Sequence, residues 1–243
     1  MNESFASRAE NATRASGTIR ILVWDAPVRV FHWLMVAAFA GAWLTAESER
    51  WRLMHVTLGY TMVGLVAFRI IWGLMGTRYA RFSAFLRSPA SVIRYLTSLA
   101  KARPERHVGH NPAGALAILA ILLMTWAVGV TGWAAYNSVG GEWPGELHEG
   151  IANAMLALVA VHVLAVVVSS ILHRDNLIGA MVSGYKSGHA GESIRRAHWG
   201  VAAVLIAAVF AWWGAQWRAA PHVPPADQPA AAQVHQQKQG NDD

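Results

Sequence analysis

Four histidines fall within or at the edge of long apolar stretches, where a polar ring is costly. They are His32, His55, His148 and His162. An ionisable residue at membrane depth indicates a functional site, although any one of these rings could instead hydrogen-bond a neighbouring helix. The spacing of the whole set favours a shared role as ligands.

His148 and His162 lie 14 residues apart in and beside one apolar stretch. With about 100° and about 1.5 Å per residue, fourteen helical steps return to within about 40° of the same face and span about 21 Å along the axis. Both rings are therefore expected to point into one groove, one near each membrane face.

Chain direction supplies a partner for each of these rings. The first span begins with His32 on the cytoplasmic side, and the second begins with His55 on the outer side. Depth therefore pairs His32 with His162 and His55 with His148. Two imidazoles at each level match the two axial ligands of a six-coordinate haem iron, and helical bundles hold such cofactors in their cores. The pattern predicts two haem b groups, about 20 Å apart, that relay electrons across the bilayer.

A histidine-based metal carrier or a non-redox membrane scaffold is the competing hypothesis. A zinc site takes three or four ligands at one depth, whereas this sequence offers two histidines per level and no Asp or Glu in the middle of any span. The chain contains no cysteine, which excludes disulfides, thiolate metal sites and covalent c-type haem.

Membrane helices must position these histidines. The chain has 243 residues, of which 54% are hydrophobic and 14% charged, whereas soluble domains average about 25% charged residues. This composition excludes an ordinary soluble enzyme and a disordered chain. A bilayer core takes about 20 helical residues, and continuous apolar runs argue against the alternating strands of a barrel. The expected spans are 30–46, 54–76, 113–133, 151–172 and 197–217.

Positive charge predicts the orientation of these spans. Fifteen of the twenty Lys and Arg residues lie in 1–29, 77–112 and 173–196. The positive-inside rule places these segments in the cytoplasm, and five spans then leave the C-terminus in the periplasm. Because the charge sorts by membrane side, we expect no nucleic-acid partner. The Pro-, Ala- and Gln-rich tail 218–243 is expected to be disordered.

Five segments between residues 20 and 186 together carry a family pattern: VWDAPVRVFHW, HVTLGYTMVGLVAFRIIWGLMGTRYARF, GHNPAGALAILAILL, LHEGIANAMLALVAVHV and RDNLIGAMVSGYK. In this pattern the chain resembles the bacterial cytochrome b561 family, which includes the b-type cytochrome subunits of membrane-bound nickel–iron hydrogenases. The resemblance implies an all-α integral membrane bundle of the bacterial inner membrane, with a four-helix diheme core. It also implies that the family's ligand histidines correspond to the four histidines named above.

The same resemblance implies a domain organisation and a function. The expected parts are a cytoplasmic N-terminal segment, the diheme core, a connection with a fifth membrane helix, and the periplasmic tail, at 1–29, 30–186, 187–217 and 218–243. Relatives move electrons between a redox partner and the quinone pool. The partner would be a hydrogenase or other dehydrogenase subunit, or a soluble cytochrome. Alternatively, the chain acts alone as a quinol oxidoreductase.

Three further residues are candidates for cofactor contacts. Arg69 is a cation inside the second span that either pairs with a haem propionate or extends to the interface. His110 and Asn111 open the third span, where similarity to related diheme quinone-reducing subunits implies hydrogen bonds to a quinone. The alternative, which we favour for Asn111, is that it caps the third helix before Pro112.

Overall fold

The computed structural model describes residues 18–85, 88–101 and 107–220. Within these ranges, five helices are long and apolar enough to cross a membrane. They are α2 (Ala26–Thr45), α3 (Arg52–Met75), α6 (Pro112–Tyr136), α7 (Trp143–His173) and α9 (Trp199–Ala219). The predicted class, a helical membrane bundle, is confirmed. The predictions for residues 1–17 and for most of the tail lie outside the described residues.

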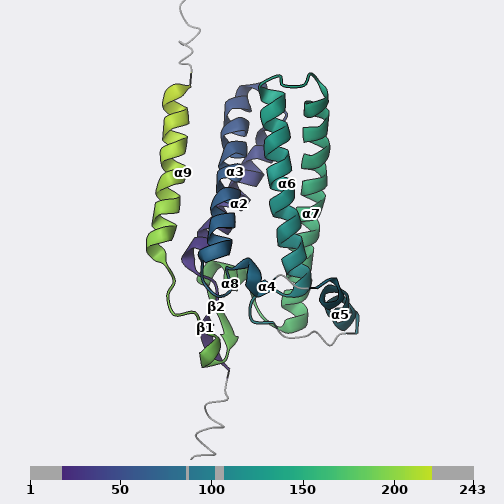
Figure 1. The fold of residues 1–243 in the computed structure, drawn as a ribbon, viewed down its shortest axis with the longest axis vertical. Coiled ribbons are helices and arrows are strands. Elements are labelled where there is room, and N and C mark those ends of the chain that lie inside the picture. The colour runs from purple at the N-terminus through teal and green to yellow at the C-terminus, as the bar shows by residue number, and fades with distance from the viewer. Residues whose placement is uncertain (1–17, 86–87, 102–106, 221–243) are drawn as a thin grey trace, which may run out of the picture.

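Two helical hairpins form the bundle. α2 packs against α3, α6 packs against α7, and the two hairpins meet where α3 lies against α6. The fifth helix, α9, packs mainly against α2 and stands apart from α6 and α7 (Figure 1). Apolar side chains on the outer faces of these helices, such as Leu74, Leu123 and Ile171, are exposed, as expected of surfaces that face lipid.

The centre of the bundle is packed with apolar side chains. Met155, which is 2% exposed, lies midway between His148 and His162 on α7. It belongs to a buried cluster together with Met35 and Ala38 from α2 and Leu65 from α3. The two histidine levels are thus separated by a solid apolar layer.

The fourth membrane helix begins earlier than the sequence predicts. The expected span was 151–172, whereas α7 runs from Trp143 to His173. Pro144 lies in its first turn, where the fixed backbone angle of proline suits a helix start. His148 and His162 therefore belong to one continuous helix.

A short ribbon of two strands is a correction to the sequence analysis, which argued against strands. β1 (Ile19–Leu22) pairs antiparallel with β2 (Tyr185–Gly188), with Ile19 opposite Gly188. Each strand has only four residues, so neither gives a hydropathy signal. The pairing joins segments more than 160 residues apart, which no local pattern could indicate.

The remaining short elements gather at the same end of the bundle as the ribbon. They are α4 (Phe82–Phe85), α5 (Pro89–Ala100) and α8 (Leu177–Ser183), as Figure 1 shows. Two 3₁₀ turns complete the described elements, η1 (Glu49–Trp51) before α3 and η2 (Ala190–Glu192) after β2. We call the end that carries β1, β2 and α8 the ribbon end, and the opposite end the far end.

Backbone hydrogen bonds tie the helix starts to the ribbon. The amides of Val23 and Trp24 both donate to the Gly184 carbonyl, at 2.9 and 3.0 Å. The amide of Ala26 donates to the Ala197 carbonyl at 2.8 Å. The start of α2, the end of α8 and the approach to α9 are therefore fixed together at the ribbon end.

Asp25 is the polar centre of this end. Its side chain is 1% exposed, and its Oδ1 caps α2 by accepting from the Val28 amide at 2.9 Å. Its Oδ2 accepts from Trp72 Nε1 at 3.0 Å and from Thr77 Oγ1 at 2.6 Å. A single carboxylate thus joins the beginning of α2 to the end of α3, which sets the register between the two helices.

We expect Asp25→Ala to destabilise the protein by about 2–4 kcal/mol, because it removes a helix cap and leaves the buried Trp72 Nε1 and the half-buried Thr77 hydroxyl without their acceptor. Thermal unfolding of the purified protein in detergent, followed by circular dichroism, measures this loss. Glu47→Ala is the matched control, since Glu47 is exposed in the turn after α2. Equal midpoints for the two variants would show that the Asp25 network does not hold the helices.

Candidate functional site

The far end of the bundle brings His55 and His148 together. His55 lies in the first turn of α3, and His148 lies in the second turn of α7. Their ring centroids are 6.1 Å apart and their planes are inclined at 83°. When two imidazoles bind one metal ion from opposite sides, each through a metal–nitrogen bond of about 2 Å, their ring centroids lie about 6 Å apart. The observed distance therefore suits one metal centre between the rings.

Backbone carbonyls orient both of these rings. His55 Nδ1 lies 2.8 Å from the Ala42 carbonyl oxygen, and His148 Nδ1 lies 3.0 Å from that of Val128. A carbonyl only accepts, so each Nδ1 must carry the proton, which leaves the lone pair on Nε2. This arrangement is typical of metal-ligating histidines, whose second nitrogen donates to a carbonyl or carboxylate.

Two threonines support the same carbonyls, and the sequence analysis missed them. Thr45 Oγ1 lies 3.2 Å from the Ala42 oxygen, and Thr131 Oγ1 lies 3.2 Å from the Val128 oxygen. Each threonine follows its carbonyl by three residues, so the two hairpins repeat one arrangement. Both side chains are buried. The sequence signal for them is a threonine near the end of the helix that precedes each of His55 and His148.

Gly132 leaves room for the His148 ring. A Cβ atom at this position would lie 2.8 Å from Cε1 and 2.9 Å from Nδ1 of His148, which is closer than non-bonded carbon atoms approach. The ring orientation at the far end therefore depends on the absence of a side chain here.

The ribbon end holds the second pair of predicted ligands. His32 on α2 and His162 on α7 lie close enough to interact electrostatically. Nδ1 of His32 is buried and has no hydrogen-bond partner in the protein. Buried polar atoms without a partner are rare, so this nitrogen needs a group from outside the chain, and the pair is chemically suited to a metal centre.

Arg69 and His110 lie beside this pair. His110 interacts electrostatically with both His32 and His162, as well as with Arg69. The Arg69 side chain is 2% exposed, with its guanidinium 4.9 Å from the centroid of the Phe82 ring. It therefore stays inside the protein and does not extend to the surface.

The position of Arg69 repeats the spacing seen on α7. Arg69 follows His55 by 14 residues on α3, just as His162 follows His148 by 14 on α7. Fourteen helical residues span about 21 Å. Each of these two helices therefore contributes one group to the far level and one to the ribbon level.

His110 is neutral at physiological pH. Its ring packs on Trp24 with centroids 4.5 Å apart. Burial, followed by the positive charges of Arg69 and Lys186, lowers the pKa of His110 to about 3. A neutral imidazole has one donor nitrogen and one acceptor nitrogen, so His110 can take part in either kind of hydrogen bond.

Asn111 caps α6, as we expected. Its Oδ1 accepts from the Gly114 amide at 2.7 Å, with Pro112 in the first turn. The capping interpretation is confirmed, and the Oδ1 atom is committed to it.

Larger metal clusters are not found in the part of the chain that the structure describes. Within those residues, no group of three or more His, Cys, Asp or Glu is arranged to hold a metal ion. At the far end His55 meets His148, whereas at the ribbon end His110 lies beside His32 and His162.

Comparison with known proteins adds independent information. The family model described as prokaryotic cytochrome b561 matches residues 23–184. The probable Ni/Fe-hydrogenase 1 B-type cytochrome subunit of Escherichia coli (strain K12) is 26% identical over 226 residues, which covers 74% of this chain and 96% of that protein.

Two further relatives carry similar names. The probable Ni/Fe-hydrogenase B-type cytochrome subunit of Cupriavidus necator is 26% identical and covers 68% of this chain and 86% of its own length. The subunit of the same name from Bradyrhizobium diazoefficiens is 27% identical and covers 70% and 87%. No solved structure matches the chain significantly.

We expect Gly132→Ala to displace the His148 ring, destabilise the protein by about 1–3 kcal/mol through overpacking, and reduce the haem content. Pyridine haemochrome analysis of the purified variant measures the haem. Gly64→Ala is the control, because Gly64 is exposed on α3 and a Cβ there would meet nothing within 4 Å. Wild-type haem content and stability in Gly132→Ala would contradict the tight fit.

Proposed function

The chain belongs to the prokaryotic cytochrome b561 family, and we propose on that premise that each of its two histidine levels holds one b-type haem. Family membership makes the protein a multi-pass membrane b-type cytochrome that transfers electrons with haem b. The haem supplies a one-electron couple between ferric and ferrous iron. The finer proposal concerns how many haems the chain holds and which residues bind them.

The geometry of the far level carries this proposal. His55 and His148 face each other at a centroid distance of 6.1 Å, and both direct Nε2 away from their carbonyl partners. The hydrogen bonds at Nδ1 make each imidazole a stronger ligand and fix its orientation. Because both axial positions would be taken by histidine, oxygen chemistry at the iron is disfavoured.

His32 and His162 are the proposed ligands at the ribbon level. The buried Nδ1 of His32 without a partner and the nearby ring of His162 support this assignment. Arg69 is buried at the same level, and we assign it to a haem propionate because guanidinium and carboxylate form strong paired hydrogen bonds. The neutral His110 adds a donor or an acceptor close by.

The two levels are suited to electron transfer along the bundle. His148 and His162 are separated by about 21 Å along α7, and the buried Met155 lies between them. The apolar layer excludes water from the path between them. The levels thus provide two redox positions at different depths of one membrane protein.

Charge distribution supports a cytoplasmic ribbon end in the bacterial inner membrane. Among the described residues, Arg20, Arg78, Lys186 and Arg195 all belong to segments that gather at the ribbon end. Under the positive-inside rule this end faces the cytoplasm. The ribbon-level haem then lies near the cytoplasm and the far-level haem near the periplasm.

A nickel–iron hydrogenase is the proposed redox partner, because the relatives from three bacteria are named as B-type cytochrome subunits of such enzymes. The quinone pool is the proposed second partner, with His110 and the region of Asn111 as its contact near the ribbon-level pair. Isolation of the tagged chain with or without a hydrogenase subunit distinguishes this assignment from a quinol oxidoreductase that acts alone.

We expect His162→Ala to lower the haem content from two per chain to one, because only the ribbon level loses an axial ligand. His148→Ala should also leave one haem, because it removes an axial ligand at the far level. Pyridine haemochrome analysis gives the ratio, and redox titration of each variant identifies which haem remains.

The two variants should differ in the potential of the haem that remains. Retention of two haems in His162→Ala would contradict the pairing. Identical titration curves for both variants would instead indicate a single shared haem.

We expect His110→Leu to keep both haems and to slow reduction or oxidation by a quinone about tenfold, because one hydrogen bond to the quinone carbonyl is lost. Stopped-flow reoxidation of the dithionite-reduced protein by a soluble quinone analogue measures this rate. His189→Leu is the control, since His189 is exposed beyond β2. Unchanged quinone kinetics in His110→Leu would exclude this contact.

A further inference from the structure

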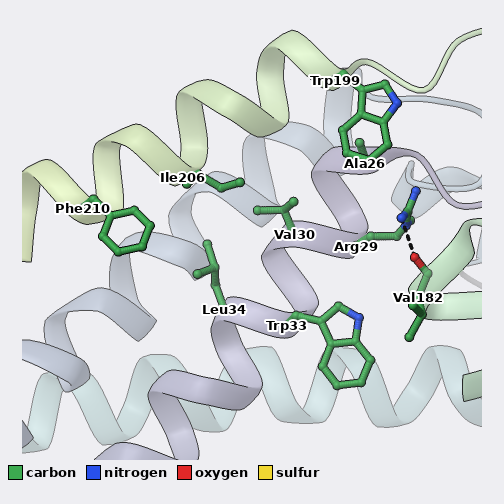
Figure 2. A pocket seen from close by; sticks show the side chains of 9 residues that line it. All are labelled: Ala26, Arg29, Val30, Trp33, Leu34, Val182, Trp199, Ile206 and Phe210. Atoms are coloured by element: carbon green, nitrogen blue, oxygen red, sulfur yellow. Dashed lines mark hydrogen bonds between the residues drawn. The ribbon is translucent and has the colours of Figure 1, made fainter.

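An apolar groove lies between α2 and α9, and none of the four candidate ligand histidines lines it. Its volume is about 370 Å³. Figure 2 shows Arg29 and Trp199 at one end and Leu34 and Phe210 toward the other. Because Arg29 and Trp199 lie in the first turns of α2 and α9, the groove runs from the ribbon end toward the middle of the bundle.

The two ends of the groove differ in chemistry. Val30, Leu34, Ile206 and Phe210 line the deeper part and are entirely apolar. The end near the helix starts contains the guanidinium of Arg29. A groove with a cation at interface depth and hydrocarbon beyond it matches the shape of an amphiphile with an anionic head.

Arg29 is held in place by its neighbours but forms no ion pair with a carboxylate among the described residues. Its Nη2 donates to the Val182 carbonyl, and its guanidinium carbon lies 5.2 Å from the centroid of the Trp199 ring. Its Nε is buried without a hydrogen-bond partner. The neighbouring carboxylate of Asp25 is already held by three donors from other residues.

Further positive charge surrounds this end of the groove. Arg195 and Arg196 are exposed and precede Trp199 by four and three residues. Within the described residues, the ion pairs are Arg52 with Glu49 and Lys186 with Asp175, so none of the three arginines is paired with a carboxylate. The groove therefore opens at a concentrated positive patch.

We infer that the groove binds one anionic phospholipid, with its phosphate on Arg29 and an acyl chain along Leu34, Ile206 and Phe210. A net negative head is attracted by basic groups at the membrane surface, and a phosphate oxygen can accept from the buried Nε of Arg29. The cationic part of a zwitterionic head is repelled by Arg195 and Arg196. The neutral head of a quinone gains little from three cations.

Native mass spectrometry of the full-length, haem-loaded protein tests this inference. The protein is reconstituted into phosphatidylcholine nanodiscs that contain a minority of phosphatidylglycerol, and the lipid that stays bound after release is identified. Wild type should retain one phosphatidylglycerol. Arg29→Gln should reduce that retention about tenfold, because a charge-assisted contact is lost.

Two further variants keep the test independent of folding at Arg29. Arg52→Gln is the charge-matched control at the far end and should retain the lipid. Ile206→Trp fills the groove while leaving Arg29 in place and should also lose the lipid, whereas Val204→Trp, on the exposed face of α9, should not. Haem absorbance and helical content confirm that each variant is folded.

Three results would overturn the inference. One is wild-type retention of phosphatidylglycerol by Arg29→Gln or by Ile206→Trp. Another is equal retention of phosphatidylcholine and phosphatidylglycerol by the wild-type protein, which would show that the groove selects no charge. The third is a bound mass that corresponds to a quinone and is lost in Ile206→Trp.

Discussion

A half-buried histidine in an apolar bundle has two ring nitrogens to satisfy, and the helices around it offer few polar groups. At the far level, main-chain carbonyls of Ala42 and Val128 take one nitrogen of each ring. Val128 lies inside α6, where its oxygen keeps a second lone pair beyond the intrahelical bond. Ala42 lies in the last turn of α2, where the Ala46 amide donates to Trp43 instead, so its oxygen is one of the carbonyls that a helix end leaves to other donors. The hairpin partner of each of these two helices therefore supplies the acceptor, and the Nε2 atoms remain available to the proposed haem iron. The packing of the two helices within each hairpin therefore also sets the orientation of the candidate ligand.

The ribbon end keeps this arrangement in register. Asp25 joins α2 to α3, and the amide of Ala26 joins α2 to the approach to α9. His32 lies less than two turns beyond the start of α2, so a shift of that start would move the ring relative to His162. Short elements that look peripheral in Figure 1 thus determine where two of the four histidines lie.

The sequence predicts the membrane helices because twenty-residue apolar runs are unambiguous, and it predicts the histidine levels because helical spacing is regular. It misses the first eight residues of α7, where Glu146 and Glu149 interrupt the apolar pattern. It also misses β1 and β2, whose pairing depends on residues distant in the chain. The carbonyl partners of His55 and His148 could not be predicted, since they depend on the rotation of one helix against another. The capping role of Asn111 was predictable because it is local.

At each of two depths, two histidines on neighbouring hairpins are proposed to bind one haem iron. Electron paramagnetic resonance of the fully oxidised wild-type protein, with the iron content measured on the same sample, tests this most directly. Two low-spin ferric haems per chain are expected. One of them should show the strongly anisotropic signal of nearly perpendicular imidazole planes, as the 83° between the rings of His55 and His148 requires. A high-spin signal from most of the iron, or a single haem per chain, would contradict it.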